Sequence, residues 1–204
     1  WLAENKFLVS TPFDDFPIPP RQELKGQYLE EKDIDYLIDL SKQDPNPLKA
    51  ARDATIVALL SFEGLKVSEL TNLRWHDLLI HNNLSSLRIL GSRVRVITLS
   101  QETATLVSTY LELVKKHTNF YANKKNSIFI SFKGRNTETM EKTISRHGLK
   151  FLLYELSTQG GFQNINTEKL RHHAINFLLS IGRSPQEIMQ HLGLRQIGNI
   201  AKHL

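Results

Sequence analysis

The sequence of 204 residues contains no cysteine, which excludes disulfide bonds and any zinc site built on thiolates. It has no signal peptide and no apolar run close to the ~20 residues that a membrane-spanning helix needs. We therefore expect a soluble, cytoplasmic protein with no membrane partner. The chain begins at Trp1 and not at Met, so we also expect it to be a fragment of a longer protein.

The hydrophobic content of 40% suffices for one domain with a sizeable core. A net charge of +5 and a pI of about 9.4 fit a polyanionic partner, although an ordinary basic domain fits them equally well. Residues 1–24 hold four of the seven prolines, which cannot continue a helix and favour extended geometry. We predict a linker over 1–24 and one folded domain over 25–204.

Hydrophobic periodicity and turn residues predict a mainly α fold with a small antiparallel sheet, in the α+β class. Asn166 and Ser184-Pro185 are expected to start the last two helices by side-chain capping. The expected helices cover 29–41, 50–62, 101–117, 138–156, 166–181 and 184–193. The expected strands cover 87–89, 94–98 and 128–130.

The helix over 50–62 is apolar on nearly every side and is followed by Gly64, which can end it in a left-handed conformation. A short amphipathic helix then runs to Arg74-Trp75. We call residues 64–75 the elbow. It is expected to hold Lys66 at the mouth of whatever site the fold builds.

The stretch from Gly64 to Asp77 resembles the first catalytic box of tyrosine recombinases (phage integrases, XerC/XerD), which reads Gly-Leu-Arg-Val-Ser-Glu-Leu. Leu170-Arg171-His172 is similar to the His-x-x-Arg box of that family. The resemblance implies the recombinase catalytic-domain fold. It also implies that residues 1–24 are the tail and tether of a missing N-terminal DNA-clamping domain.

Recombinases of this family cut DNA with a tyrosine, and two arginines fork onto the scissile phosphate to stabilise its charge. By the resemblance, the catalytic positions here are Lys66, Glu168, Arg171, Leu194 and His203. Only Arg171 is retained in type. Lys66 keeps a charge but lacks the planar fork of arginine, Glu168 would repel a phosphate, and Leu194 cannot donate a hydrogen bond.

The nucleophile is also missing, because His203 stands where the family has its tyrosine. The chain has five tyrosines, none after the last box: Tyr28, Tyr36, Tyr110, Tyr121 and Tyr154. The hairpin lacks the family's lysine, and Arg93 and Arg95 are poor general acids because arginine does not deprotonate. We therefore expect a DNA-binding protein without strand cleavage, such as a regulator or an architectural partner of an active recombinase.

Double-stranded DNA is the expected partner, with self-association or an active recombinase as further possibilities. Each cation alone is more often a solvated surface charge, and loops around the hairpin and Gly134-Arg135 are favoured. The candidate DNA contacts are Lys66, Arg74, Arg88, Arg93, Arg95, Lys133, Arg135, Arg146, Arg171 and Arg195.

Two other functions stay open from the sequence alone. One is an active recombinase with a variant site, whose nucleophile is His203 or a tyrosine beyond Leu204. The other is a protein-interaction module that no longer binds DNA. Glu168 and His172 have the spacing of a metal pair, but without a third ligand a surface pair is favoured, and we expect no metal or cofactor. His172, His173 and His191 are expected to pack or to line the pocket where the family has its catalytic site.

Overall fold

The computed structural model describes residues 28–81, 84–91, 93–117, 120–132 and 143–195. The predicted linker over 1–24 lies outside these ranges, so that prediction stays untested. Helices and short 3₁₀ turns (η) dominate the described residues. The helical elements are α1 (Glu31–Ser41), α2 (Pro47–Ser61), α3 (Val67–Asn72), η1 (Trp75–Asp77), α4 (Gln101–His117), η2 (Phe120–Ala122), α5 (Arg146–Gly160), α6 (Thr167–Ser180) and α7 (Pro185–Leu192).

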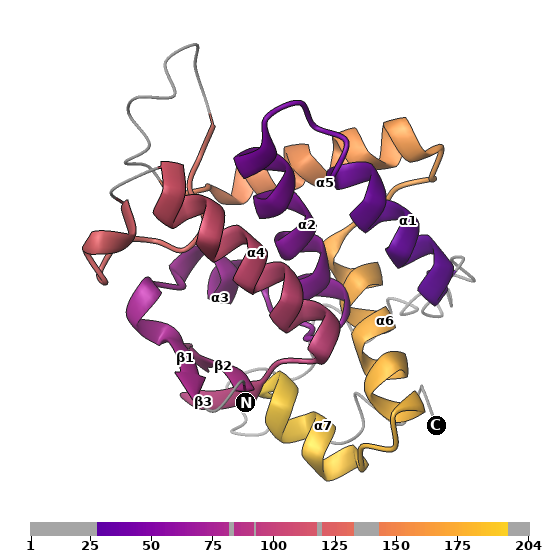
Figure 1. Ribbon diagram of the computed structural model, residues 1–204. Helices are drawn as coiled ribbons and strands as arrows, with labels where there is room; N and C mark the ends of the chain where they lie inside the picture. Colours follow the sequence, from indigo (N-terminus) through magenta and orange to yellow (C-terminus); the bar gives the residue numbers. More distant parts are fainter. Residues whose placement is uncertain (1–27, 82–83, 92, 118–119, 133–142, 196–204) are drawn as a thin grey trace, which may run out of the picture.

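Helix α2 is the centre of the core, as its apolar sequence predicts. Twelve of its 15 residues are buried, and Figure 1 shows it between α1 and α4, with which it makes its main contacts. The side chain of Asn46 caps its start by accepting hydrogen bonds from the N–H groups of Leu48 and Lys49, at 3.0 and 3.1 Å. Pro47 follows at the first helical position, where its missing N–H costs nothing.

Helix α2 ends one residue before the predicted end at position 62. The helix itself ends at Ser61, and Gly64 lies two residues beyond the capping residue Phe62. Gly64 does adopt the predicted left-handed conformation, with φ of 61°. The Leu65 N–H closes the turn by donating to the Leu59 carbonyl at 3.2 Å. This turn redirects the chain into α3.

The sheet contains β1 (Leu78–His81), β2 (Leu84–Ile89) and β3 (Arg95–Thr98), antiparallel and in the order β1-β2-β3. The predicted β2–β3 hairpin is confirmed. The strand predicted over 128–130 is wrong, because this segment makes only isolated bridges such as Ile130 to Thr143. The third strand is β1, which was missed because it is short and three of its four residues are exposed.

The beginning of α5 was also predicted wrongly. Positions 138–142 lie outside the described residues, and the helix starts at Arg146 after its cap Ser145, whose hydroxyl accepts the Gly148 N–H at 3.0 Å. The caps of the last two helices are confirmed. Asn166 accepts the N–H groups of Glu168 and Lys169 at 3.0 and 2.9 Å, and Ser184 caps α7 ahead of Pro185.

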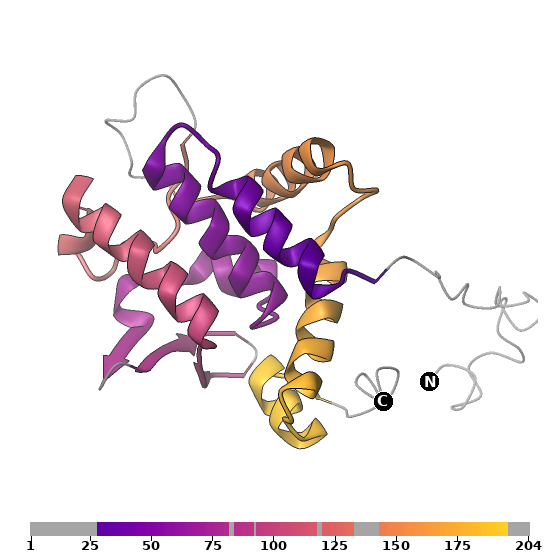
Figure 2. The same cartoon turned by 45° about the vertical axis from the view of Figure 1, so that its right-hand side comes forward.

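Helices α6 and α7 lie together at one end of the molecule, next to the sheet (Figure 2). They share a small apolar cluster that includes Ile175, Leu178, Ile188 and Leu192. Helix α7 also contacts β3, and α6 contacts α2. This arrangement brings the end of α7, the start of β3 and the elbow to one place, although they are far apart in sequence. None of the helices in the described part of the chain is long and apolar enough to cross a membrane.

Candidate functional site

The elbow is held by Glu69 of α3, whose carboxylate makes three hydrogen bonds. Arg95 of β3 forks onto both oxygens at 2.8 and 3.1 Å, and the Lys66 N–H donates to Oε2 at 2.9 Å. The side chains of Glu69 and Arg95 are only 6% and 10% exposed, respectively. Burial by itself would raise the pKa of Glu69, but the hydrogen bonds and the positive charges of Arg95 and Arg171 outweigh it and lower that pKa. Glu69 therefore stays ionised and fixes Arg95.

Arg95 and Arg171 also hold the C-terminal end of α7. The Nε of Arg95 donates to the His191 carbonyl at 2.6 Å, and the Nη2 of Arg171 donates to the Leu192 carbonyl at 2.9 Å. The last carbonyls of a helix lack partners within the helix and carry partial negative charge, so cations stabilise this end. These two arginines thus join α6 and β3 to α7.

Arg171, which the family resemblance matches to a catalytic arginine, has a second carbonyl partner. Its Nη1 donates to the Gly64 carbonyl at the turn between α2 and α3. Burial lowers the pKa of this guanidinium, and the nearby Glu69 partly offsets the effect. Both terminal nitrogens of Arg171 are therefore engaged with backbone oxygens of the protein itself.

The hairpin contacts Leu194, one of the positions that the family resemblance matches to catalytic residues. Arg93 is exposed, and its Nη1 donates to the Leu194 carbonyl at 3.4 Å. The Leu194 side chain packs on the apolar cluster of α6 and α7. Glu168 is exposed in the first turn of α6, where a carboxylate complements the helix dipole. His203 lies outside the described residues.

The other predicted DNA contacts have different surroundings. Arg88 pairs with the buried Asp77 at 3.0 Å, and the backbone N–H of Arg74 donates to the same carboxylate at 3.0 Å. The Nη1 of Arg74 donates to the Thr143 hydroxyl at 3.5 Å. Arg195 is exposed. Lys133 and Arg135 lie outside the described residues. None of these positions is tested as a DNA contact, so the assignments stay predictions.

Of the three histidines expected to pack or to line the pocket (His172, His173 and His191), two have structural surroundings. His173 is buried against Phe62 and Phe177, and its Nδ1 lies 2.8 Å from the Ser61 carbonyl. The Nε2 of His191 lies 3.2 Å from Oε2 of the buried Glu63, without the angle of a hydrogen bond. These contacts join α6 and α7 to the end of α2.

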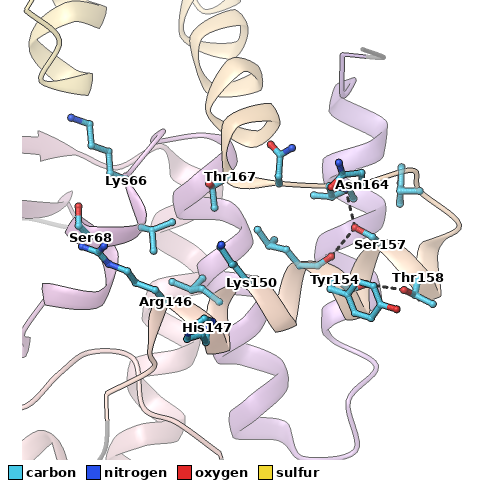
Figure 3. A pocket seen from close by; sticks show the side chains of 16 residues that line it. Lys66, Ser68, Arg146, His147, Lys150, Tyr154, Ser157, Thr158, Asn164 and Thr167 are labelled. Carbon is cyan, nitrogen blue, oxygen red and sulfur yellow. Dashed lines mark hydrogen bonds between the residues drawn. The ribbon is translucent and has the colours of Figure 1, made fainter. Parts of the chain in front are cut away.

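A cavity of about 1020 Å³ opens between α3, α5 and the start of α6. Figure 3 shows Lys66 and Ser68 on one side of it and α5 on the other, with the Arg146 side chain reaching toward Ser68. Lys150 and Thr167 also line it. The sequence interpretation missed Lys150 and Ser68. The available signal was the spacing of Arg146, Lys150 and Tyr154, which puts them on one face of a helix.

The comparisons with known proteins agree with this fold. Residues 27–202 match the family described as "Phage integrase family". XerC tyrosine recombinase of Staphylococcus aureus (strain MSSA476) is 24% identical over 202 residues, covering 97% of this chain and 63% of its own length. This chain thus spans less than two thirds of that relative.

Solved structures show the same architecture. The crystal structure of XerA recombinase superposes with a TM-score of 0.69 at 22% identity, covering 92% of this chain and 62% of its own. XerH recombinase bound to its difH substrate gives a TM-score of 0.67 at 16% identity, covering 85% and 49%. The fold is that of a tyrosine recombinase catalytic domain, as the sequence predicted. The chain belongs to the phage integrase family.

Proposed function

We propose that this chain is a DNA-binding member of the tyrosine recombinases that does not cleave its DNA. The observation that carries the proposal is the state of Arg171, the one catalytic residue retained in type. Both its terminal nitrogens donate to the carbonyls of Gly64 and Leu192. These contacts use one N–H on each of the two nitrogens that would fork onto a scissile phosphate, and they fix the guanidinium against the protein's own backbone.

The remaining positions of the cage add to this argument. Lys66 offers a point charge without a planar fork, Glu168 is an anion, and Leu194 is apolar. Loss of a single donor that stabilises a developing oxyanion costs about 10²- to 10³-fold in rate. The replaced nucleophile position, His203, removes the covalent step itself. Together these replacements favour a protein that keeps the fold and lacks the chemistry.

The support for DNA binding is a row of cations at one cavity. Lys66, Arg146 and Lys150 are all exposed and line the same opening. Cations in such a row neutralise phosphates and release counterions, which gives affinity without sequence preference. Proteins of the same fold have been solved with DNA, among them the Tn1549 transposon integrase in complex with circular intermediate DNA. A DNA-binding role also fits the cytoplasmic location that the composition favours.

The test is a labelled duplex titrated with the full chain over a series of salt concentrations, followed by a denaturing gel. We expect a gel shift that weakens steeply with salt and no covalent adduct. A covalent adduct would overturn the proposed loss of cleavage and identify an active recombinase. No shift at low salt would overturn DNA binding and favour the protein-interaction module. An active recombinase of known site, run in parallel, shows that the gel detects adducts.

A further inference from the structure

The cavity beside α5 has two chemically different ends. Lys66, Arg146 and Lys150 make one end cationic. Tyr154 and Phe162 lie at the other end, and the Tyr154 side chain is 67% exposed although it is large and aromatic. Lys150 and Tyr154 lie on successive turns of α5 and both line the cavity, and Figure 3 shows the Lys150 side chain pointing toward Thr167.

The wall between the two ends is apolar. Leu149, Leu153 and Ile165 line it and are buried. These three residues belong to the hydrophobic core, and they make the cavity wall apolar where they reach it. Contacts to phosphates alone need charge and hydrogen-bond donors, so they leave the exposed Tyr154 ring unexplained. A flat ring that stacks on an aromatic side chain and covers aliphatic groups would use the Tyr154 ring and this wall. The cavity therefore suits a ligand with an anionic end and a flat, largely apolar end.

The spacing suits one nucleotide, and the volume leaves ample room for it. Residues four apart on one helix face, such as Lys150 and Tyr154, are separated by about 6 Å along the axis, which is comparable to the span from a phosphate to its own base. The volume of about 1020 Å³ is at the upper limit for small-ligand sites. Asn164 also lines the cavity, in a left-handed conformation with φ of 56°. Its amide offers both a donor and an acceptor for a base edge.

We propose that the cavity binds one nucleotide of the bound DNA, turned out of the base stack. The phosphate lies among Lys150, Arg146 and Lys66, and the base stacks on Tyr154 with its edge toward Asn164. The inference rests on the proposed DNA binding. It specifies what is recognised by the α5 face, that is, by Arg146, Lys150 and Tyr154, which line the cavity. Because a free mononucleotide carries the same chemistry, the experiment separates the two sources.

The test compares two labelled duplexes of the same sequence, one fully paired and one with a single unpaired adenine. Turning a base out of a duplex costs unpairing and unstacking energy, and most of this energy is not needed when the base is already unpaired. We expect the full chain to bind the bulged duplex about tenfold more tightly, since each 1.4 kcal/mol of avoided cost corresponds to a factor of ten. Fluorescence anisotropy at fixed salt measures both affinities.

Two matched variants assign the preference to the cavity. Tyr154→Ala removes the stacking surface, so nothing offsets the cost of turning a base out and the preference for the bulged duplex should disappear. Binding to both duplexes should then rest on the phosphate contacts alone. Tyr28→Ala is the control, because Tyr28 is equally exposed at 66% and does not line the cavity. It should keep the full preference. Circular dichroism confirms that both variants fold.

The outcomes separate the inference from the proposed function. Equal affinity for the two duplexes, with DNA binding intact, overturns the inference and leaves the proposed function standing. No binding to either duplex at low salt overturns both. A preference that survives in Tyr154→Ala also overturns the inference, because it then arises from bending of the bulged DNA. If a free deoxyadenosine monophosphate binds in a Tyr154-dependent way and the bulge gives no preference, the ligand is a mononucleotide, and the extruded nucleotide is overturned.

Discussion

Arg95 and Arg171 are enclosed by carbonyls and the Glu69 carboxylate, whereas Lys66, Arg146 and Lys150 face solvent along the α5 cavity. Both groups surround the same elbow and carry the same charge. The enclosed arginines join α6, α7 and β3, so their charges act on the stability of the fold. The exposed cations contribute little to packing and remain available to an anion. Burial and partners, and not charge alone, therefore separate structural cations from those that are open to a ligand.

The largest effect expected from breaking this contrast is that of Glu69→Ala. The change leaves Arg95 buried without its carboxylate, which should lower the free energy of unfolding by about 3–5 kcal/mol. Chemical denaturation measures the loss. Glu168→Ala is the matched control, since Glu168 is exposed in the first turn of α6 and should cost about 0.3–1 kcal/mol. Equal losses in the two variants would contradict the structural role of Glu69.

Gly64→Ala should have the next largest effect, because the added methyl group has no room at the turn that holds Arg171. An added Cβ would lie 2.5 Å from Cδ2 of Leu192 and 3.0 Å from Cβ of Ala174. The left-handed backbone costs about 1–2 kcal/mol and overpacking adds about 1–3 kcal/mol. Gly161→Ala separates the two contributions, because Gly161 has φ of 69° and open space around its Cβ position. Thermal unfolding should show a clearly larger loss for Gly64→Ala than for Gly161→Ala.

The pH dependence of stability tests the same cluster with a smaller effect. The pKa of Glu69 is lower in the folded protein than its usual 4.5, so its contribution is complete above that pH. The contribution is lost as pH falls through the lower folded value, because the unfolded state then binds the proton first. Urea unfolding from neutral to acid pH measures the slope. Glu69→Gln should be less stable at neutral pH and should lose less stability on acidification than the unmodified chain.

The smallest effect on stability is expected for the exposed cations. Lys66→Ala and Lys150→Ala should each change the free energy of unfolding by no more than about 0.5 kcal/mol. Each should weaken duplex binding and reduce the slope of log affinity against log salt by about 0.9. Lys42→Ala serves as the control, because Lys42 is exposed at the end of α1 and does not line the cavity. A Lys42→Ala slope that falls equally would indicate that net charge, and not the α5 face, governs binding.

The sequence by itself determined the helices, their caps and the family. The central helix, the left-handed Gly64, the caps Asn166 and Ser184, and the β2–β3 hairpin follow from patterns within a few residues, because helix and turn energetics are local. The two stretches that resemble the family's catalytic boxes, Gly64 to Asp77 and Leu170-Arg171-His172, could also be recognised directly in the sequence. The sequence interpretation failed at the strand over 128–130, at β1 and at the start of α5, where the local pattern was weak.

Only the tertiary structure decided what the cations do. Arg171 meets the Gly64 carbonyl across 107 positions of sequence, and Arg95 meets the His191 carbonyl across 96. Neither contact leaves a mark in the neighbouring residues, so both arginines were predicted as DNA contacts alongside Lys66. The cavity that joins Lys66 to Lys150 likewise exists only where α3, α5 and α6 converge. Whether a charge is enclosed or exposed depends on packing between distant segments, because that packing sets its solvation and its partners.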